Sequence, residues 1–332
     1  MFEVKSKIRN YTVQFSEKIK IDFQKGDFLF VDENVYRLYK NKLPKTSNTF
    51  ILKANESTKD FGNVSSIINL LLLSKFKKNN RLVVVGGAVC QDIIGFVASI
   101  LYRGVEWVFY PTTLVAQADS CIGGKTSINY GGIKNIIGTF YPPSQVFICT
   151  KFLKTLPEDE RRSGIGEMLH YFVLNNLKSS IEDQDHIIIG ESLKIKKSVI
   201  EKDEFDKGAR NLFNYGHTFG HSLESISNFK LKHGVAVTKG MDMANWIAWK
   251  RRYITKKRYL HLKSLIAFNM PDYKIPDVKK FVEILSHDKK NIDNCVNFIL
   301  PYGKSEFRKI PIKNNKQLIK DISEYEIGCS NE

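Results

Sequence analysis

Three of the seven histidines in the sequence lie within seventeen residues, at His217, His221 and His233. Imidazole nitrogens with a nearby carboxylate form a mixed nitrogen and oxygen ligand set, which suits Zn²⁺ with an open position for a substrate. His217 and His221 are four residues apart, so on a helix they share one face. A single histidine is usually an ordinary polar residue, whereas this cluster indicates a metal site or acid–base chemistry. The spacing alone does not select the ligands.

A glycine-rich turn, Gly86-Gly87-Ala88, follows a run of β-branched residues and precedes a helix-like segment. Glycines at such a turn let the backbone approach a pyrophosphate, and the N-terminus of the next helix supplies free N–H donors. The turn is not the GxGxxG fingerprint of dinucleotide-binding proteins. The pattern therefore fits a tight packing turn equally well.

A second glycine-rich segment, Asp119–Thr126 (DSCIGGKT), places two glycines beside Lys125, and Lys134 and Asn135 follow shortly after. Backbone donors and an ammonium group at one turn can bind a phosphate. The spacing departs from the Walker A motif, and a purely structural loop stays possible. The second lysine and the asparagine favour an anion site.

The elements that would position these residues alternate between strands and helices over the first 150 residues. Arg81–Val85 (RLVVV) is a continuous β-branched run, typical of a strand buried on both faces of a parallel sheet. The other strands predicted here are Asp27–Val31, Trp107–Tyr110 and Val146–Thr150, and the helices are Val64–Phe76 and Asp92–Tyr102. This order predicts an α/β domain with a mostly parallel sheet.

The second half of the chain has a different pattern of residue types. Residues 156–290 contain helix-like stretches and few β-branched runs, with one late strand predicted at Val296–Leu300. We therefore predict an α/β domain over residues 1–155 and a helical domain over residues 156–332.

The composition is that of an ordinary globular protein. The chain has 332 residues, of which 42% are hydrophobic and 26% charged, and this excludes a disordered chain, a collagen and a disulfide-stapled miniprotein. No apolar run is long enough to span a bilayer, and the first ten residues do not form a secretory signal. We therefore expect a cytoplasmic protein with no membrane partner. The five scattered cysteines contain no CxxC pair, so neither a disulfide framework nor a thiolate zinc site is indicated.

The charge balance is strongly basic, with 51 lysines and arginines against 35 aspartates and glutamates and a formal net charge of +16. Such an excess favours acidic partners, including nucleic acid and phosphorylated metabolites. The lysines are spread along the chain without a recognisable nucleic-acid module, so we expect a solvated lysine-rich surface and no nucleic-acid partner. A nucleic-acid-binding protein without catalysis is the alternative from a different class.

The motifs and their order resemble the 3-dehydroquinate synthases of the sugar phosphate cyclase superfamily. The resemblance covers residues 86–171 and 196–240 and is carried by GGAVCQDIIGFVAS, RGVEWVFYPTTLVAQADSCIGGKTSINYGGIKNIIGTFYPP, LPEDERRSGIGEMLHY, NYGHTFGHSLE and HGVAV. Weaker matches lie at residues 31–39, 55–61 and 288–290. The resemblance implies an N-terminal NAD-binding α/β domain and an all-α C-terminal domain that binds metal and substrate. In this family zinc or cobalt would lie in the cleft between the domains.

The resemblance also assigns site residues by position. Glu167, His217 and His233 match the family's three metal ligands. Arg103 matches a residue that reaches the phosphate site of a neighbouring subunit, which implies a homodimer. The positions that match the substrate pocket are Asp119, Lys125, Lys134, Asn135, Lys196, Arg210, Asn214 and His221, and His170 occupies a further active-site position of the family. The positions that match the NAD site are Asp32, Asn34, Glu56, Lys59, Gly86, Gly87, Asp92, Thr112, Thr113, Lys125 and Lys134.

Four positions depart from the family's usual pattern. Ala88 and Gln91 stand where glycines are usual, and an added side chain there can crowd a pyrophosphate. Val235 replaces a glutamate and removes a polar group beside His233. His170 stands where the family carries an active-site lysine, and this change can alter recognition of a hydroxyl or carboxylate.

The implied activity is a carbon–oxygen lyase reaction of the shikimate pathway, which leads to the aromatic amino acids. NAD and a divalent metal would support the cyclisation of 3-deoxy-arabino-heptulosonate 7-phosphate to 3-dehydroquinate, with elimination of phosphate. One alternative is a cyclase for another sugar phosphate, such as sedoheptulose 7-phosphate or glucose 6-phosphate. Another is an NAD-dependent polyol dehydrogenase, against which the lysines of the phosphate loop argue.

Overall fold

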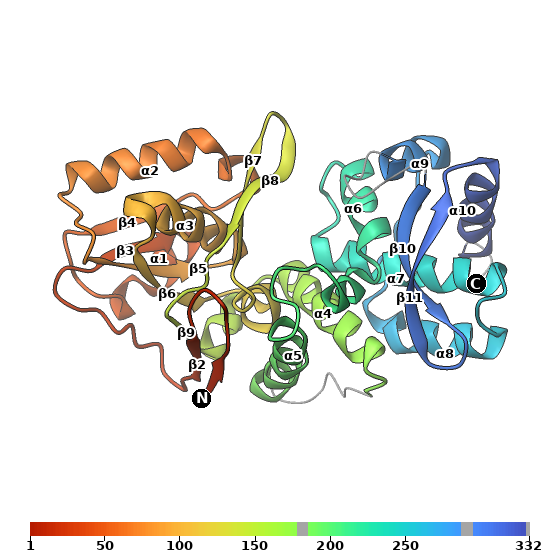
Figure 1. The fold of residues 1–332 in the computed structure, drawn as a ribbon, viewed down its shortest axis with the longest axis horizontal. Helices are drawn as coiled ribbons and strands as arrows, with labels where there is room; N and C mark the ends of the chain where they lie inside the picture. The colour runs from red at the N-terminus through yellow and green to blue at the C-terminus, as the bar shows by residue number, and fades with distance from the viewer. Residues whose placement is uncertain (178–184, 287–294, 330–332) are drawn as a thin grey trace. The chain divides into compact units, whose positions relative to one another are not determined.

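The computed structural model describes residues 1–177, 185–286 and 295–329. Its contacts divide the chain into two units (Figure 1). The first unit comprises Met1–Pro157 and Gln184–Phe205, and the second comprises Glu158–Asp183 and Asp206–Glu332. The domains predicted from the sequence, 1–155 and 156–332, differ from this division in one segment. Helix α5 (Asp185–Ile200) belongs to the first unit, because its Ser192 and Lys196 donate hydrogen bonds to the carbonyl oxygens of Ala118 and Asp119.

The first unit is built on a seven-stranded sheet with the strand order β1-β2-β9-β6-β5-β3-β4. Neighbouring strands are parallel except for the antiparallel pair β1 and β2. The strands are β1 (Phe2–Val4), β2 (Tyr11–Phe15), β3 (Phe28–Asp32), β4 (Thr49–Leu52), β5 (Arg81–Gly86), β6 (Glu106–Pro111) and β9 (Gln145–Ile148). Every residue of β5 is buried, as its apolar run predicts for a central parallel strand.

Helices follow the strands of this sheet and begin at their carboxyl ends. These helices are α1 (Glu33–Tyr39), α2 (Phe61–Leu73) and α3 (Ala88–Ile100), with short turns η1 (Lys40–Lys42), η2 (Glu56–Thr58), η3 (Leu101–Arg103), η4 (Ala116–Ser120) and η5 (Thr150–Thr155). Helix α3 packs against β5 and β6 and begins earlier than the sequence predicts, because Gly87 is its N-cap. The strands predicted at 27–31, 81–85, 107–110 and 146–150 are confirmed as β3, β5, β6 and β9, with ends shifted by one or two residues.

A hairpin of β7 (Lys125–Tyr130) and β8 (Ile133–Phe140) begins at the end of the second glycine-rich segment and was not predicted. The strands are joined by Gly131 and Gly132, whose φ angles of 58° and 76° suit the left-handed turn of a two-residue hairpin. No residue of β8 is buried, so this strand shows none of the apolar alternation by which strands are recognised.

The second unit is mainly helical. Its helices are α4 (Glu158–Leu174), α6 (His217–Ile226), α7 (His233–Lys250), α8 (Lys256–Ile266), α9 (Val278–Ser286) and α10 (Lys316–Cys329), with the short turns η6 (Ala209–Asn214) and η7 (Ala267–Asn269). Helix α7 is buried along most of its length and packs against α4 and α6. The predicted late strand is confirmed as β10 (Cys295–Tyr302), which pairs with β11 (Glu306–Lys313). The expected all-α region therefore also contains one antiparallel hairpin.

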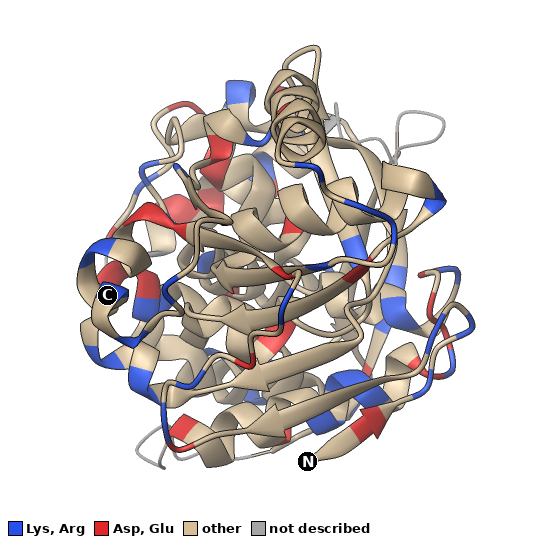
Figure 2. Cartoon of the chain, turned by 90° about the vertical axis from the view of Figure 1, so that its left-hand side faces the viewer, with Lys and Arg blue, Asp and Glu red and all other residues tan. Residues whose placement is uncertain are grey.

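The basic residues are dispersed over the elements of the fold. Lysine and arginine lie on many separate helices and loops in Figure 2, and aspartate and glutamate lie among them. In the described part of the chain, no helix has both the length and the apolar character that crossing a membrane requires. Cys90, Cys121, Cys149 and Cys295 are free thiols, and the first three are buried.

Candidate metal and nucleotide sites

A buried carboxylate lies among the clustered histidines of the second unit. Glu167 on α4 has only 3% of its surface exposed. Its Oε1 atom lies 2.6 Å from His233 Nε2 and 3.6 Å from His217 Nε2. The three residues that the resemblance assigned as metal ligands are therefore brought together, although they come from three different helices.

Glycines allow the three helices to approach closely enough for this contact. A Cβ atom on Gly166, the residue before the carboxylate, would lie 1.9 Å from the carbonyl oxygen of Gly234, the residue after His233. Helices α6 and α7 meet in the same way, because a Cβ on Gly240 would lie 2.1 Å from the carbonyl oxygen of Gly216. Only residues without a side chain fit at these crossings, so the glycines determine how near the carboxylate lies to the imidazoles.

The electrostatics of the cluster couple the carboxylate to the imidazoles. Burial alone would raise the pKa of Glu167, but the neighbouring His233 and His217 lower this pKa well below its usual value. Burial would lower the pKa of His233, but Glu167 and Glu224 raise it well above its usual value. A fixed carboxylate with two imidazole nitrogens is a donor set that binds divalent transition metals such as Zn²⁺. The residues present therefore fit a divalent cation.

Glu224 on α6 is a member of this cluster that the sequence reasoning missed. Its Oε2 atom lies 2.9 Å from His233 Nδ1, so it accepts a hydrogen bond from that nitrogen and leaves Nε2 for Glu167 or a metal. The candidate ligand atoms of Glu224, His233 and His221, which lies three residues before Glu224 on the same helix, are all within 4.8 Å of one another. This spacing of one helical turn could have identified it in the sequence. Val235, which stands where the family has a glutamate, is buried and offers His233 no polar group. Glu224 supplies a polar group beside His233 instead.

His170 lies one turn after Glu167 on α4 and has 1% of its surface exposed. Its Nδ1 atom lies 3.6 Å from Glu167 Oε2, and its ring centroid lies 5.2 Å from that of His217. The ring of His221 is stacked on that of His233, with the centroids 5.5 Å apart. Both histidines that the resemblance placed at active-site positions therefore lie beside the candidate metal ligands.

The nucleotide positions of the first unit gather at the carboxyl edge of its sheet. Asp32 ends β3 and caps α1, while Gly86 ends β5 and pairs across the sheet with Pro111, just before Thr112. Ligands of open α/β sheets bind at this edge. Helix α3 begins at Ala88, and its N-cap residue Gly87 provides no side-chain cap, so the first N–H groups of the helix remain available to an anion.

The glycines of this turn also serve packing. A Cβ on Gly86 would lie 2.5 Å from Cys90 Sγ, and one on Gly87 would lie 3.0 Å from Thr113 Cγ2. Gln91, which was expected to crowd a pyrophosphate, is buried and exchanges two hydrogen bonds of 2.7 Å with Ser120. The side chain of Gln91 therefore forms hydrogen bonds within the first unit. The turn both packs closely against its neighbours and leaves the N–H groups at the start of α3 without a side-chain cap.

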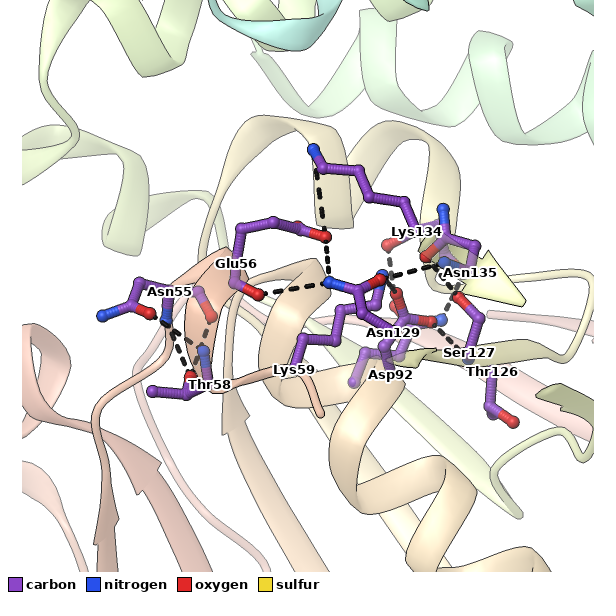
Figure 3. A network of polar contacts seen from close by, with 12 residues as sticks. Asn55, Glu56, Thr58, Lys59, Asp92, Thr126, Ser127, Asn129, Lys134 and Asn135 are labelled. Atoms are coloured by element: carbon purple, nitrogen blue, oxygen red, sulfur yellow. Dashed lines mark hydrogen bonds and ion pairs between the residues drawn. The ribbon is translucent and has the colours of Figure 1, made fainter. Parts of the chain in front are cut away.

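A polar network joins five of the remaining nucleotide and pocket positions (Figure 3). Lys59 is buried and donates to Asp92 Oδ2 at 2.5 Å, and Asp92 Oδ1 accepts from the backbone of β7. Burial raises the pKa of Asp92, although Lys59 opposes this shift. The network continues through Asn135, which accepts from Ser127 and donates to Asn129. Asn129 in turn donates to Glu56, whose Oε1 atom lies 3.9 Å from Lys134 Nζ. Sequence reasoning assigned no role to Ser127 or Asn129, although both lie within the segment that carries the resemblance.

Asp119 and Lys196 form a further pair within the first unit. Lys196 is almost fully buried, and its Nζ atom donates 2.8 Å hydrogen bonds to the carbonyl oxygen and to Oδ1 of Asp119. In the second unit, Arg210 is buried in η6, and Asn214 ends the same turn. The structure places these four pocket residues in two different units.

Three further assigned positions lie in the first unit. Asn34 accepts a hydrogen bond from Arg37, Lys125 is exposed at the start of β7, and Arg103 is exposed in η3 with a φ of 62°. The weak match at residues 288–290 lies outside the described residues.

Comparison with known proteins shows the family to which the chain belongs. The model of the 3-dehydroquinate synthase N-terminal domain matches residues 49–163, and that of the C-terminal domain matches residues 165–291. A 3-dehydroquinate synthase of Clostridium tetani (strain Massachusetts / E88) is 36% identical over 93% of this chain and 88% of its own length. The chain belongs to the 3-dehydroquinate synthase family. It is therefore a 3-dehydroquinate synthase-like enzyme, a phosphate-eliminating cyclase of the lyase class. A 3-dehydroquinate synthase of Helicobacter pylori (strain HPAG1) is 33% identical over 96% of this chain and 97% of its own length.

Solved structures show the same fold. A 2-deoxy-scyllo-inosose synthase complexed with carbaglucose-6-phosphate, NAD⁺ and Co²⁺ has a TM-score of 0.83 at 21% identity, covering 98% of this chain and 99% of that one. A 2-epi-5-epi-valiolone synthase from Streptomyces hygroscopicus subsp. jinggangensis 5008, with NAD⁺ and Zn²⁺ bound, has a TM-score of 0.80 at 22% identity, covering 96% and 97%. A glycerol dehydrogenase from Schizosaccharomyces pombe has a TM-score of 0.60 and covers 92% and 84%.

Proposed function

We propose that this enzyme converts 3-deoxy-arabino-heptulosonate 7-phosphate to 3-dehydroquinate, using NAD and a divalent metal ion. The observation that carries the proposal is the buried Glu167 carboxylate, held 2.6 Å from His233 and 3.6 Å from His217. Relatives named 3-dehydroquinate synthase, about a third identical over most of the chain, support the choice of substrate. The NAD⁺ and the Co²⁺ or Zn²⁺ in the related cyclase structures support the choice of cofactors.

In this proposal, residues of the first unit would bind NAD and residues of the second unit would bind the metal. When bound, NAD⁺ accepts and returns a hydride, and the metal polarises the hydroxyl that is oxidised. Glu167, His217 and His233 would hold the metal, with Glu224 fixing the tautomer of His233. The edge residues of the sheet and the free N-terminus of α3 would hold the dinucleotide.

The substrate carries a phosphate and a carboxylate, so several cations must orient it. We assign this role to Lys125, Lys134, Lys196 and Arg210. Lys196 is already oriented by two hydrogen bonds to Asp119, so it needs little further ordering when it meets an anion. Such positioning lowers the entropic part of the activation barrier, and the positive charges stabilise negative charge on the substrate. Asn135, Asn214 and His221 are assigned to the substrate hydroxyls.

A cyclase for another sugar phosphate is the second candidate, and His170 favours it. The family's lysine offers a long flexible cation at this position, whereas His170 is buried and fixed beside Glu167. A site without that cation would bind a substrate carboxylate less strongly. Sedoheptulose 7-phosphate and glucose 6-phosphate lack a carboxylate and are the substrates to compare.

A substrate panel tests both candidates. Purified protein is loaded with Zn²⁺ or Co²⁺ and NAD⁺ and incubated with each of the three sugar phosphates, and phosphate release, product mass and NADH absorbance are followed. The proposal predicts phosphate release from the heptulosonate phosphate, a product with the mass of 3-dehydroquinate and no accumulation of NADH. Release from another sugar phosphate alone would select the second candidate, and steady NADH formation from a polyol would select a dehydrogenase. Glu167→Gln is the negative control.

We also propose that the enzyme acts as a homodimer in which Arg103 serves the neighbouring subunit. Arg103 is exposed on the turn that follows α3. Mixing inactive Arg103→Ala protein with inactive Glu167→Gln protein should restore part of the activity, because some mixed dimers then contain one complete site. No restoration in a confirmed mixed dimer would contradict this arrangement.

A further inference from the structure

The residue that departs most from the family at the metal cluster, His170, is placed like a ligand. We propose that His170 supplies a fourth protein ligand to the divalent cation, in addition to Glu167, His217 and His233. This inference rests on the proposed function only in requiring that a divalent cation binds this cluster.

The distances between donor atoms carry the proposal. His170 Nδ1 lies 3.6 Å from Glu167 Oε2, which is too long for a hydrogen bond between them. With metal–ligand bonds of about 2.0–2.2 Å, two ligands of one tetrahedral cation lie about 3.3–3.6 Å apart. His217 Nε2 lies at the same 3.6 Å from the other oxygen of the carboxylate. The distance from His170 to Glu167 is therefore the one expected between two ligands of the same cation. It equals the distance from Glu167 to His217, which the resemblance names as a ligand.

The three residues form a compact group. The candidate ligand atoms of Glu167, His170 and His217 all lie within 4.8 Å of one another. Glu167 and His170 project from the same face of α4, one turn apart, so one rigid helix fixes their separation. A ligand pair on one helix turn requires little ordering when a cation arrives.

The surroundings hold the imidazole in place. His170 is 1% exposed, and its ring lies 3.9 Å from that of Tyr171 and 5.9 Å from that of Phe213, measured between centroids. Imidazole is the commonest side-chain metal ligand, whereas a lysine ammonium cannot bind a cation. Histidine at this position therefore changes the donor set from one carboxylate and two imidazoles to one carboxylate and three imidazoles.

Cobalt substitution tests the proposal without any substrate. The visible absorption of bound Co²⁺ reports its ligands, X-ray absorption counts the imidazoles, and competition with a chelator gives the affinity. His170→Phe fills the same aromatic surroundings without a nitrogen donor, and His170→Lys restores the family's residue. Both variants should lose one imidazole, shift the cobalt spectrum and bind Co²⁺ at least about tenfold more weakly. His261→Ala, an exposed histidine on α8, is the matched control and should leave all three readouts unchanged.

The outcomes separate this inference from the proposed function. If folded His170→Phe protein keeps the wild-type spectrum, imidazole count and affinity, the fourth ligand is refuted, whatever the enzyme turns over. If His170→Ala weakens binding and His170→Phe restores it, the residue acts by packing and the proposal is also refuted. If the imidazole is lost as expected but no sugar phosphate is converted, the ligand is established and the proposed function fails alone.

Discussion

The substitution Gly166→Ala tests whether close contact between α4 and α7 creates the metal site. The added Cβ would lie 1.9 Å from the carbonyl oxygen of Gly234. An ordinary contact needs 3.4 Å, so the two helices must separate locally by about 1.5 Å. Metal sites tolerate deviations of only about 0.2 Å in ligand distance. Because Glu167 and His233 lie next to these two glycines on opposite helices, the separation moves the carboxylate away from the imidazole.

We expect Gly166→Ala to lower the affinity for Zn²⁺ by about 100-fold or more and the free energy of unfolding by about 1–3 kcal/mol. Chelator competition and urea titration measure the two effects. Gly190→Ala on α5 is the matched control, because a Cβ there meets nothing within 4 Å and alanine favours a helix by about 0.5–1 kcal/mol. Wild-type metal affinity in a folded Gly166→Ala protein would refute the view that this helix crossing places the ligands.

Three further substitutions test other contacts. Gln91→Ala removes two buried hydrogen bonds to Ser120 and should lower the free energy of unfolding by about 1–3 kcal/mol in urea, so an unchanged midpoint would contradict the role given to this residue. Lys59→Met removes the cation that favours ionised Asp92, whose pKa burial raises. The folded state then disfavours the ionised carboxylate, so the loss of stability should be larger at neutral pH than near about pH 4, and an equal loss at both would count against it. Glu224→Ala should weaken Zn²⁺ binding by about 10- to 100-fold, because it removes the hydrogen bond that orients His233. Glu224→Gln keeps an acceptor oxygen and should weaken binding less. Equal Zn²⁺ affinities in both variants and the wild type would show that this hydrogen bond does not contribute to metal binding.

The sequence predicted the first unit best where consecutive residues are all buried. Strand β5 is apolar at almost every position and is buried at every position, so its composition and its environment agree. The hairpin of β7 and β8 was not predicted, because the exposure of β8 leaves no pattern in its residue types. Helix α5 joins the first unit through hydrogen bonds from Ser192 and Lys196, which composition does not reveal.

The candidate site shows the same difference between local and distant relationships. The spacing of His217 and His221 predicted a shared helix face, and both lie on α6 with ring centroids 5.7 Å apart. The position of Glu167 in the metal site came from the resemblance, since its distance along the chain says nothing about its neighbours. Glu224 was within reach of the helix argument, at one turn from His221, and was overlooked.

By itself, the sequence determined the buried central strands, the helical spacing of the histidines and the presence of glycines where bulk is excluded, because these features depend on a few neighbouring residues. Tertiary structure alone decided which carboxylate meets which imidazole. That decision depends on the crossings of α4, α6 and α7, where carbonyl oxygens lie too close to Gly166 and Gly240 for any side chain. Such contacts join residues tens of positions apart, and no local pattern of residue types encodes their distance.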